Sequence, residues 1–223
     1  MKKQSLAAAF LAGALVLSSC GASNAVKGAG IGAAGGAAIG AGIGRVLGNT
    51  AVGAVIGGVV GGTAGTLIGK KMDQQKKELE RDVKDAKIES VNDGQAIRVT
   101  FDSGILFATG SASLSSTSQA TLRKFAANLS EHSDTDLMII GHTDNTGTDR
   151  VNNPLSYNRA ASVRSFLAGQ GVSSSRMKVE GKGSYEPVAD NSTVAGRREN
   201  RRVEVYILPS KEMVKAAQDG TLR

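Results

Sequence analysis

The side chains best suited to a charge-based binding site are Asp144 and Arg159, fifteen residues apart. The apolar run LMII at residues 137–140 predicts a short buried strand, so Asp144 lies where a strand gives way to a loop. Asn153 followed by Pro154 then predicts the start of a helix, with Asn153 as its N-cap. At 3.6 residues per turn, Arg159 falls within the apolar arc of this helix.

An arginine on a core-facing arc needs an anionic partner, because a guanidinium cannot escape burial by losing its proton. The partner can be internal, and Asp144 is the nearest candidate along this stretch. It can also be brought by a ligand. The two residues alone leave open whether they form a structural pair that closes the end of a sheet or a binding site.

The N-terminus has the pattern of an exported lipoprotein. Two lysines, a short apolar run and small residues predict a signal peptide over residues 1–19. The only cysteine of the chain, Cys20, follows at once, and this arrangement resembles a bacterial lipobox, in which the cysteine thiol carries lipid. We therefore expect a lipidated N-terminus at residues 20–27 that inserts in outer-membrane lipid, with the C-terminal domain in the periplasm.

The charge balance is modestly basic. The formal net charge is +7, and loss of two lysines with the signal peptide leaves about +5. Such a balance suits an anionic membrane surface or an acidic polymer. Export and the absence of Trp argue against nucleic acid as a partner.

Glycines recur every fourth residue from Gly28 to Gly69, in two series that Asn49 and Thr50 separate. In lipid, small residues let helices approach closely, and each series is long enough, about 30 Å as a helix, to match a bilayer core. The pattern therefore predicts a glycine-zipper membrane hairpin over residues 28–69. A flexible linker and a soluble glycine-rich domain are the alternatives, and Arg45 is the main objection to membrane insertion.

From Lys70 the composition changes to interspersed bases and acids with helix-forming residues. Residues 70–89 are predicted to form a solvated, charged helical spacer. Residues 90–209 are long enough for a domain with its own core. A tail at 210–223 follows, in which we predict a frayed helix without a function.

The domain is predicted to be α+β. The alternation in AIRVTFD predicts a strand, and apolar residues at helical spacing predict a helix from Ser115 to Ser130. The strand before Asp144 and the helix at Pro154 follow, and two more strands are expected at 177–181 and 202–208. The order βαβαββ gives a mixed sheet with helices on one face.

Several spaced motifs of this domain carry a family resemblance. They are GHTDNTG, the segment LSxxRAxxVxxxL at 155–167, GKGxxxP, and NxTxxGRxxNRRVE ending at Glu204. Together they resemble the OmpA-like peptidoglycan-binding domain. The whole arrangement is similar to the glycine-zipper outer-membrane lipoproteins.

The resemblance implies a ligand, the diaminopimelate residue of the peptidoglycan stem peptide. It implies that Asp144 holds the ammonium and Arg159 the carboxylate of the free amino-acid end, a division that fits the chemistry of both side chains. Asn152, placed just ahead of the expected helix, and Thr146 match positions that add hydrogen bonds. Ser103 is a weaker match, because DSGILFATG is more apolar than the family pattern at this loop.

Two other groups have alternative interpretations. The cluster of Arg197, Arg198, Arg201 and Arg202 either pairs with acids, which we favour, or forms a basic face for the wall. His142 is predicted to be a strand-end residue, because the sequence offers no ligand set for a metal around it.

The leading functional hypothesis is a non-enzymatic tether between outer membrane and cell wall, without a cofactor. A wall hydrolase would need a zinc set or an activated nucleophile, which we do not find in the sequence. A third hypothesis is an assembly, pore or stator-like, that oligomerises through the glycine zipper and uses the wall as an anchor.

Overall fold

The computed structural model describes residues 60–108 and 110–222. The signal peptide, Cys20 and the predicted hairpin up to residue 59 lie outside the described residues. The helices are α3 (Gly62–Asp82), α4 (Ser103–Leu106), α5 (Ser116–Glu131), α6 (Asp149–Gly169), the 3-10 turn η1 (Ser174–Arg176), α7 (Val194–Asn200) and α8 (Lys211–Gln218). The strands are β1 (Lys87–Val91), β2 (Ala96–Asp102), β3 (Thr135–Gly141), β4 (Met177–Gly181) and β5 (Arg202–Pro209).

The strands form one mixed sheet in the order β1-β2-β5-β3-β4. Only β3 and β4 run parallel, and all other neighbours are antiparallel. The predicted α+β class with a mixed sheet is therefore confirmed. Four elements were not predicted. They are the edge strand β1, whose charged residues hide its alternation, the short helix α4, the turn η1, and α7, which lies in the stretch expected to be a basic turn.

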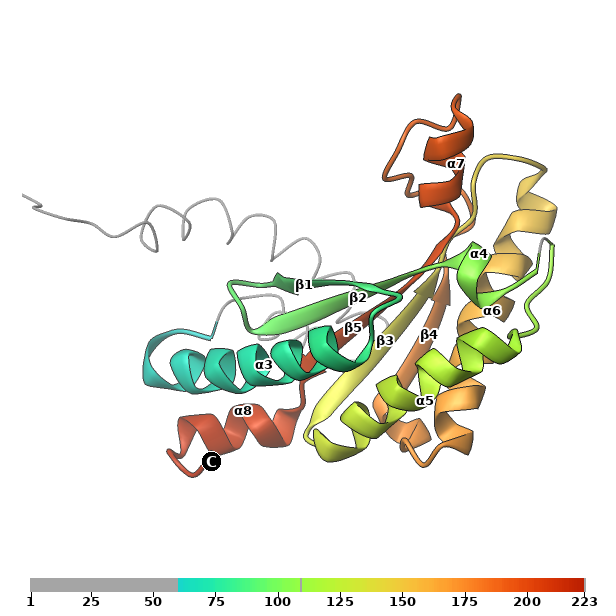
Figure 1. Cartoon of the computed structure of the whole chain (residues 1–223). Helices are drawn as coiled ribbons and strands as arrows, with labels where there is room; N and C mark the ends of the chain where they lie inside the picture. Colours follow the sequence, from blue (N-terminus) through green and yellow to red (C-terminus); the bar gives the residue numbers. More distant parts are fainter. Residues whose placement is uncertain (1–59, 109, 223) are drawn as a thin grey trace, which may run out of the picture.

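The main core lies between one face of the sheet and helices α3, α5, α6 and α8, which Figure 1 shows on the same side. Alternate residues of the central strands point into it, as Val99 of β2 and Val205 of β5 do, and both are fully buried. Phe101 of β2 meets Phe125 of α5 edge to face, with ring centroids 5.5 Å apart. Helices on one face of the sheet were expected, and the structure has this arrangement.

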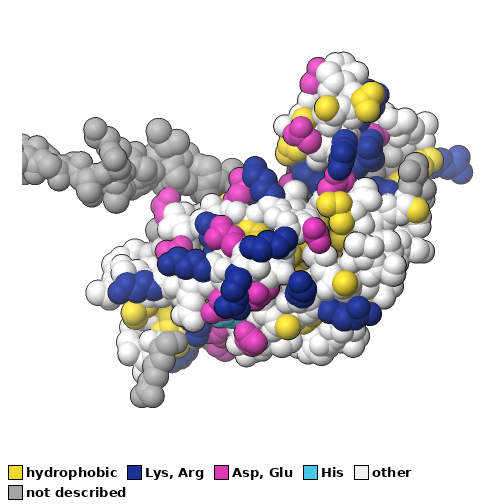
Figure 2. Space-filling model, viewed as in Figure 1, with side chains coloured by type: hydrophobic (Ala, Val, Ile, Leu, Met, Phe, Trp, Pro, Cys, Tyr) yellow, Lys and Arg dark blue, Asp and Glu magenta, His cyan; other side chains and the backbone are white. Residues whose placement is uncertain are grey.

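The predicted solvated spacer is wrong. Helix α3 buries Ile68, Met72 and Leu79 in the core of the domain, while its charged residues form the outer surface seen in Figure 2. A buried hydrogen bond also links α3 to α5, in which Gln75 Nε2 donates to Asn128 Oδ1 at 3.0 Å. The interspersed charges masked an apolar stripe, and residues 62–69, assigned to the membrane hairpin, belong to this helix.

The predicted tail is also part of the domain. Helix α8 buries Met213, Val214 and Ala217 and packs against α3. Ser210 caps it by accepting a hydrogen bond from Met213 N at 3.1 Å. Within the described residues, no helix is long and apolar enough to cross a membrane.

Helix α6 begins five residues before the predicted start. Thr148 is its N-cap, so Asn153 is not the cap and Pro154 lies inside the helix, in its second turn. Glycines at the ends of β3 and β4 bring α6 close to the sheet. A Cβ on Gly141 would lie 2.0 Å from Ser156 O, and one on Gly181 would lie 2.7 Å from the Ser156 hydroxyl. This close approach sets Arg159, one turn later, beside the loop that carries Asp144.

Candidate ligand-binding site

A cleft of about 470 Å³ lies where β2 and β3 end, a volume in the range of small-ligand sites. All five residues that the sequence suggests for the ligand lie in its wall: Ser103, Asp144, Thr146, Asn152 and Arg159. They come from α4, from the β3–α6 loop and from α6. Phe107, Thr143, Val151, Leu155 and Arg201 complete most of the remaining wall.

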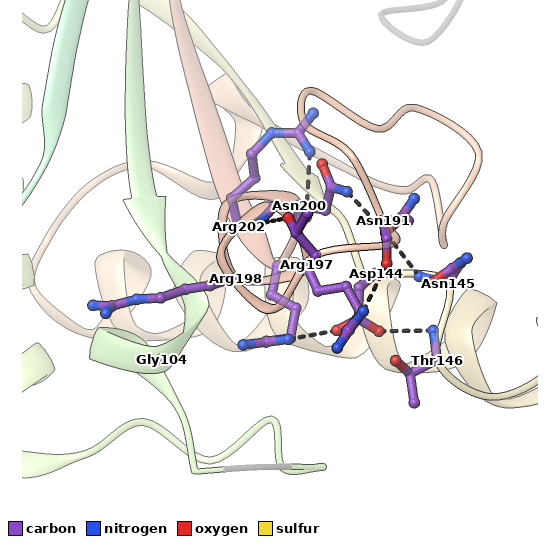
Figure 3. Close-up of polar contacts among 12 residues, drawn as sticks. Gly104, Asp144, Asn145, Thr146, Asn191, Arg197, Arg198, Asn200 and Arg202 are labelled. Atoms are coloured by element: carbon purple, nitrogen blue, oxygen red, sulfur yellow. Dashed lines mark hydrogen bonds and ion pairs between the residues drawn. The ribbon is translucent and has the colours of Figure 1, made fainter.

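The backbone around Asp144 is held from two sides. His142 N donates to Arg202 O at 2.9 Å, and Thr143 N donates to Gly183 O at 2.8 Å. The carboxylate accepts a hydrogen bond from Thr146 N at 2.8 Å, as Figure 3 shows. Its other oxygen accepts from Arg201 Nη1 at 2.5 Å. Asp144 is therefore fixed in place, with only 8% of its side chain exposed.

Arg159 is almost completely buried, at 3% exposure. Its Nε donates to Ser111 O at 3.0 Å, and its guanidinium lies over the Phe107 ring, 5.4 Å from the centroid. Among residues 60–108 and 110–222, no carboxylate lies within ion-pair distance of it. Its positive charge thus faces the cleft supported by a carbonyl and a ring but not by an acid.

The two predicted partners therefore meet at one cleft without pairing with each other. Burial and the nearby charge of Arg201 lower the pKa of Arg159, and Asp144 offsets only part of this effect. Burial would raise the pKa of Asp144, but hydrogen bonds from Arg201 and Thr146 outweigh it and hold this pKa below its usual range. Both groups are charged at neutral pH, and the acid that the buried arginine lacks can come from a ligand.

Of the three other predicted residues, Thr146 lies in the cleft wall and holds the Asp144 carboxylate through its backbone N–H. Asn152 lies in the first turns of α6, not ahead of the helix, and its Nδ2 donates to the carbonyls of Asp144 and Thr146, each at 3.3 Å. It therefore shapes the loop that holds the acid. The hydroxyls of Ser103 and Thr143 are buried in the cleft wall and have no partner among the described residues. They are available to a ligand.

Sequence reasoning did not single out Arg201 or Phe107 as parts of the site. Arg201 was considered only as one of four arginines, and extended backbone at the start of β5 sends it to the opposite side from Arg202. That alternation was the signal that could have separated the two. Phe107 belongs to the apolar stretch that departs from the family pattern, and here its ring packs against Arg159.

The basic cluster mainly pairs with acids, as favoured from the sequence. Arg198 pairs with Asp102 and Arg202 with Glu204, while Arg197 donates to backbone carbonyls. His142 is buried at the end of β3, and burial, with repulsion from Arg202, lowers its pKa to about 4. No group of three or more metal-ligating side chains occurs within the described part of the chain.

Comparison with known proteins identifies the domain that carries this cleft. Residues 106–201 match the sequence model of the OmpA family, and these residues include α6 and all of the cleft except Ser103 and Gly104. These residues of the chain form an OmpA family domain. Residues 1–73 match a second family, the YMGG-like Gly-zipper. The OmpA family assignment agrees with the resemblance carried by the sequence motifs.

Three relatives illustrate the similarity. The probable lipoprotein YiaD of Escherichia coli is 36% identical over 142 residues, which cover 64% of this chain and 65% of that protein. The peptidoglycan-binding protein ArfA of Mycobacterium bovis is 38% identical over 50% of this chain and 34% of its own length. The solved cell wall anchor of the T6SS from Pseudomonas aeruginosa is 31% identical, with a TM-score of 0.54 over 61% of this chain and 97% of that one. Of the two curated relatives, YiaD and ArfA, the chain spans less than two thirds of the length.

Proposed function

We propose that this protein is a non-enzymatic tether that holds the cell wall by binding the diaminopimelate residue of peptidoglycan stem peptides. The observation that carries the proposal is the buried Arg159, which faces the cleft without a carboxylate partner among the described residues while Asp144 lies in the same wall. A ligand that brings both an ammonium and a carboxylate supplies a partner of opposite charge to Asp144 and to Arg159. The free end of diaminopimelate carries both groups on one carbon atom.

The division of roles follows from charge. Asp144 accepts hydrogen bonds from the ammonium, and Arg159 donates from its guanidinium to the carboxylate. The unpartnered hydroxyls of Ser103 and Thr143 lie in the same wall and can add hydrogen bonds to the ligand. Two relatives support the ligand class, because one is named a peptidoglycan-binding protein and the other a cell wall anchor.

The membrane end of the tether rests on the sequence. The proposal assigns signal cleavage before Cys20, acylation of its thiol, and insertion of the acyl chains in the outer membrane. A relative named as a probable lipoprotein and the glycine-zipper match over residues 1–73 support this assignment. Labelling cells with a radioactive fatty acid tests it, since Cys20→Ala should abolish the label.

Binding is tested by sedimentation of the protein with purified sacculi. Asp144→Ala and Arg159→Ala should each remove a charged contact worth about 2–5 kcal/mol and abolish co-sedimentation without unfolding the domain. Asp149→Ala and Arg150→Ala are the matched controls, because both residues are exposed on the first turn of α6 and neither lines the cleft. Free diaminopimelate should compete with sacculi. If both cleft variants sediment like the wild type, the assignment is wrong.

Two further arms separate this function from the alternatives. Release of soluble muropeptides from sacculi by the purified protein would favour a hydrolase. Crosslinking of the membrane-embedded chain into a discrete oligomer would favour the assembly that the glycine-zipper match suggests. The tether proposal expects no muropeptide release, and it is compatible with a monomer.

A further inference from the structure

Asp144, which the proposed function assigns to the ligand ammonium, already has a cationic partner. One carboxylate oxygen is 2.5 Å from Arg201 Nη1, and the other accepts from Thr146 N. An ammonium therefore cannot enter this position as an addition to an open carboxylate. It has to share or replace the contact with Arg201.

The side chain of Arg201 is placed to make such an exchange. It is 38% exposed, and its ion pair with Asp144 is the one side-chain contact that the described residues show for it. Its backbone is fixed independently, since Ser103 N donates to Arg201 O at 2.9 Å and Arg201 N donates to Arg197 O at 3.1 Å. The guanidinium can therefore leave Asp144 while the chain around it stays in place.

The charges of the cleft favour a particular exchange. Asp144 contributes one negative charge, and Arg159 and Arg201 contribute two positive charges to the same wall. We propose that Arg201 is an exchangeable counter-ion: the ammonium of a ligand replaces it at Asp144, and the released guanidinium joins Arg159 on the carboxylate of the same ligand. This inference rests on the proposed function and assigns a further residue that determines its specificity.

The exchange selects for zwitterions. A ligand with ammonium and carboxylate on one carbon replaces both interactions, because Arg201 loses one carboxylate and gains another. A plain amine would displace Arg201 without offering it an anion, and three cationic groups would then share one carboxylate in a partly buried site. A plain carboxylate can contact Arg159 but leaves the ion pair of Asp144 and Arg201 intact. The cleft should thus prefer an amino-acid end group over either half alone.

The test uses the full-length protein in detergent, bound to purified sacculi, and three competitors of similar length. They are meso-diaminopimelate, 1,5-diaminopentane, which lacks both carboxylates, and pimelate, which lacks both ammonium groups. The measured quantity is the concentration of each that displaces half of the protein. For the wild type we expect diaminopimelate to be the most potent and diaminopentane the least.

Arg201→Gln should change the relative potency of the competitors and leave the fold intact. Diaminopentane should become more potent because Asp144 is free, and diaminopimelate less potent because one carboxylate contact is lost. The ratio of the half-displacing concentrations of diaminopentane and diaminopimelate should fall by roughly 10-fold or more, the range for a charge-assisted hydrogen bond. Arg201→Lys, which keeps the charge, should restore part of the ratio. The matched control is Arg198→Gln, since Arg198 pairs with Asp102 and does not line this cleft.

The outcomes separate the two proposals. If diaminopimelate does not displace the wild type, the proposed function fails. If it displaces the wild type and Arg201→Gln keeps the same ratio as the control, the function stands and the exchange is excluded. An equal loss of potency for all three competitors in Arg201→Gln, with unchanged unfolding, also contradicts the exchange, because it indicates a structural role. A smaller ratio of diaminopentane to diaminopimelate half-displacing concentrations in Arg201→Gln than in the control supports the exchange.

Discussion

Two arginines adjacent in the chain, Arg201 and Arg202, form ion pairs of opposite character. Arg201 is 38% exposed and pairs with Asp144 in the ligand cleft, whereas Arg202 and Glu204 are 5% and 7% exposed on the other side of β5. In the second pair, Arg202 also donates to the carbonyls of Asn200 and Glu186, and Tyr206 donates its hydroxyl hydrogen bond to Glu204 at 2.8 Å.

The difference shows how one chemical pair can serve either structure or binding. The polar partners of Arg202 and Glu204 are all internal to the protein, so their charges are already compensated, although both side chains help to line a second cleft of about 400 Å³. Arg201 has solvent on one side and a second arginine nearby, so its partner can change. Completeness of internal hydrogen bonding, not the presence of charges, distinguishes the two regions.

The largest effect should follow from Glu204→Gln. This change leaves the Arg202 charge buried without compensation and should lower the free energy of unfolding by about 3–5 kcal/mol. Urea denaturation measures it. The double variant Arg202→Met/Glu204→Leu should recover part of the loss, because no unpaired charge remains. A loss below about 1 kcal/mol for the single variant would mean that this pair is as adaptable as the pair in the cleft.

His142, near the ion pair of Arg202 and Glu204, should make the free energy of unfolding depend on pH. Its pKa is depressed from 6.5 to about 4 by burial and by Arg202, with Glu204 opposing. Between these values the unfolded chain binds a proton that the folded chain does not, so stability is present above pH 6.5 and falls by up to about 3 kcal/mol as pH approaches 4. Urea titrations at several pH values should show a shallower decline for His142→Asn. An unchanged slope would assign the decline to other groups.

The same carboxylate-to-amide change should cost less at the cleft. Asp144→Asn removes the ion pair with Arg201, but this arginine can be hydrated and the new amide oxygen still accepts from Thr146 N. We expect a loss of about 1 kcal/mol in unfolding free energy, together with loss of sacculus binding. A loss as large as that of Glu204→Gln would show that Asp144 is chiefly structural.

The smallest effect is expected at Arg198, which is 70% exposed and pairs with Asp102. Arg198→Gln should leave the unfolding free energy almost unchanged, as is usual for surface ion pairs, and should leave sacculus binding unchanged. Thermal unfolding at low and high salt checks this prediction. A clear change in binding would extend the functional surface beyond the cleft and onto α7.

The sequence predicted the central strands and the location of the cleft because these depend on local patterns. Alternation identified β2, and an apolar run followed by an acid identified the end of β3. The predicted start of α6 was wrong because the Asn153–Pro154 pair is a strong local signal, while the helix in fact begins at Asp149 with Thr148 as its N-cap. The helix accommodates Pro154 in its second turn and packs closely against Gly141 and Gly181 at Ser156.

Other features needed the folded chain. The stripe of Ile68, Met72 and Leu79 on α3 includes Gln75, and abundant charges on the other faces made the helix look solvated. The pairing of Asp144 with Arg201 could not be read from the sequence either, because the partner is 57 residues away and has three similar neighbours. Long-range choices between equivalent side chains are settled by geometry that local patterns do not contain.

The docking of α3 has a mechanical consequence for a tether. On the N-terminal side of α3, the backbone N–H and carbonyl of Val60 both bond to the Gln95 side chain, each at 2.9 Å. These contacts lie where β2 begins, whereas the cleft is lined by residues that follow the ends of β2 and β3. Figure 1 shows that the start of β2 and the ends of β2 and β3 lie at opposite ends of the sheet. In the proposed tether, tension applied on the N-terminal side of α3 would therefore load the Gln95 contacts and α3 before it reached the cleft.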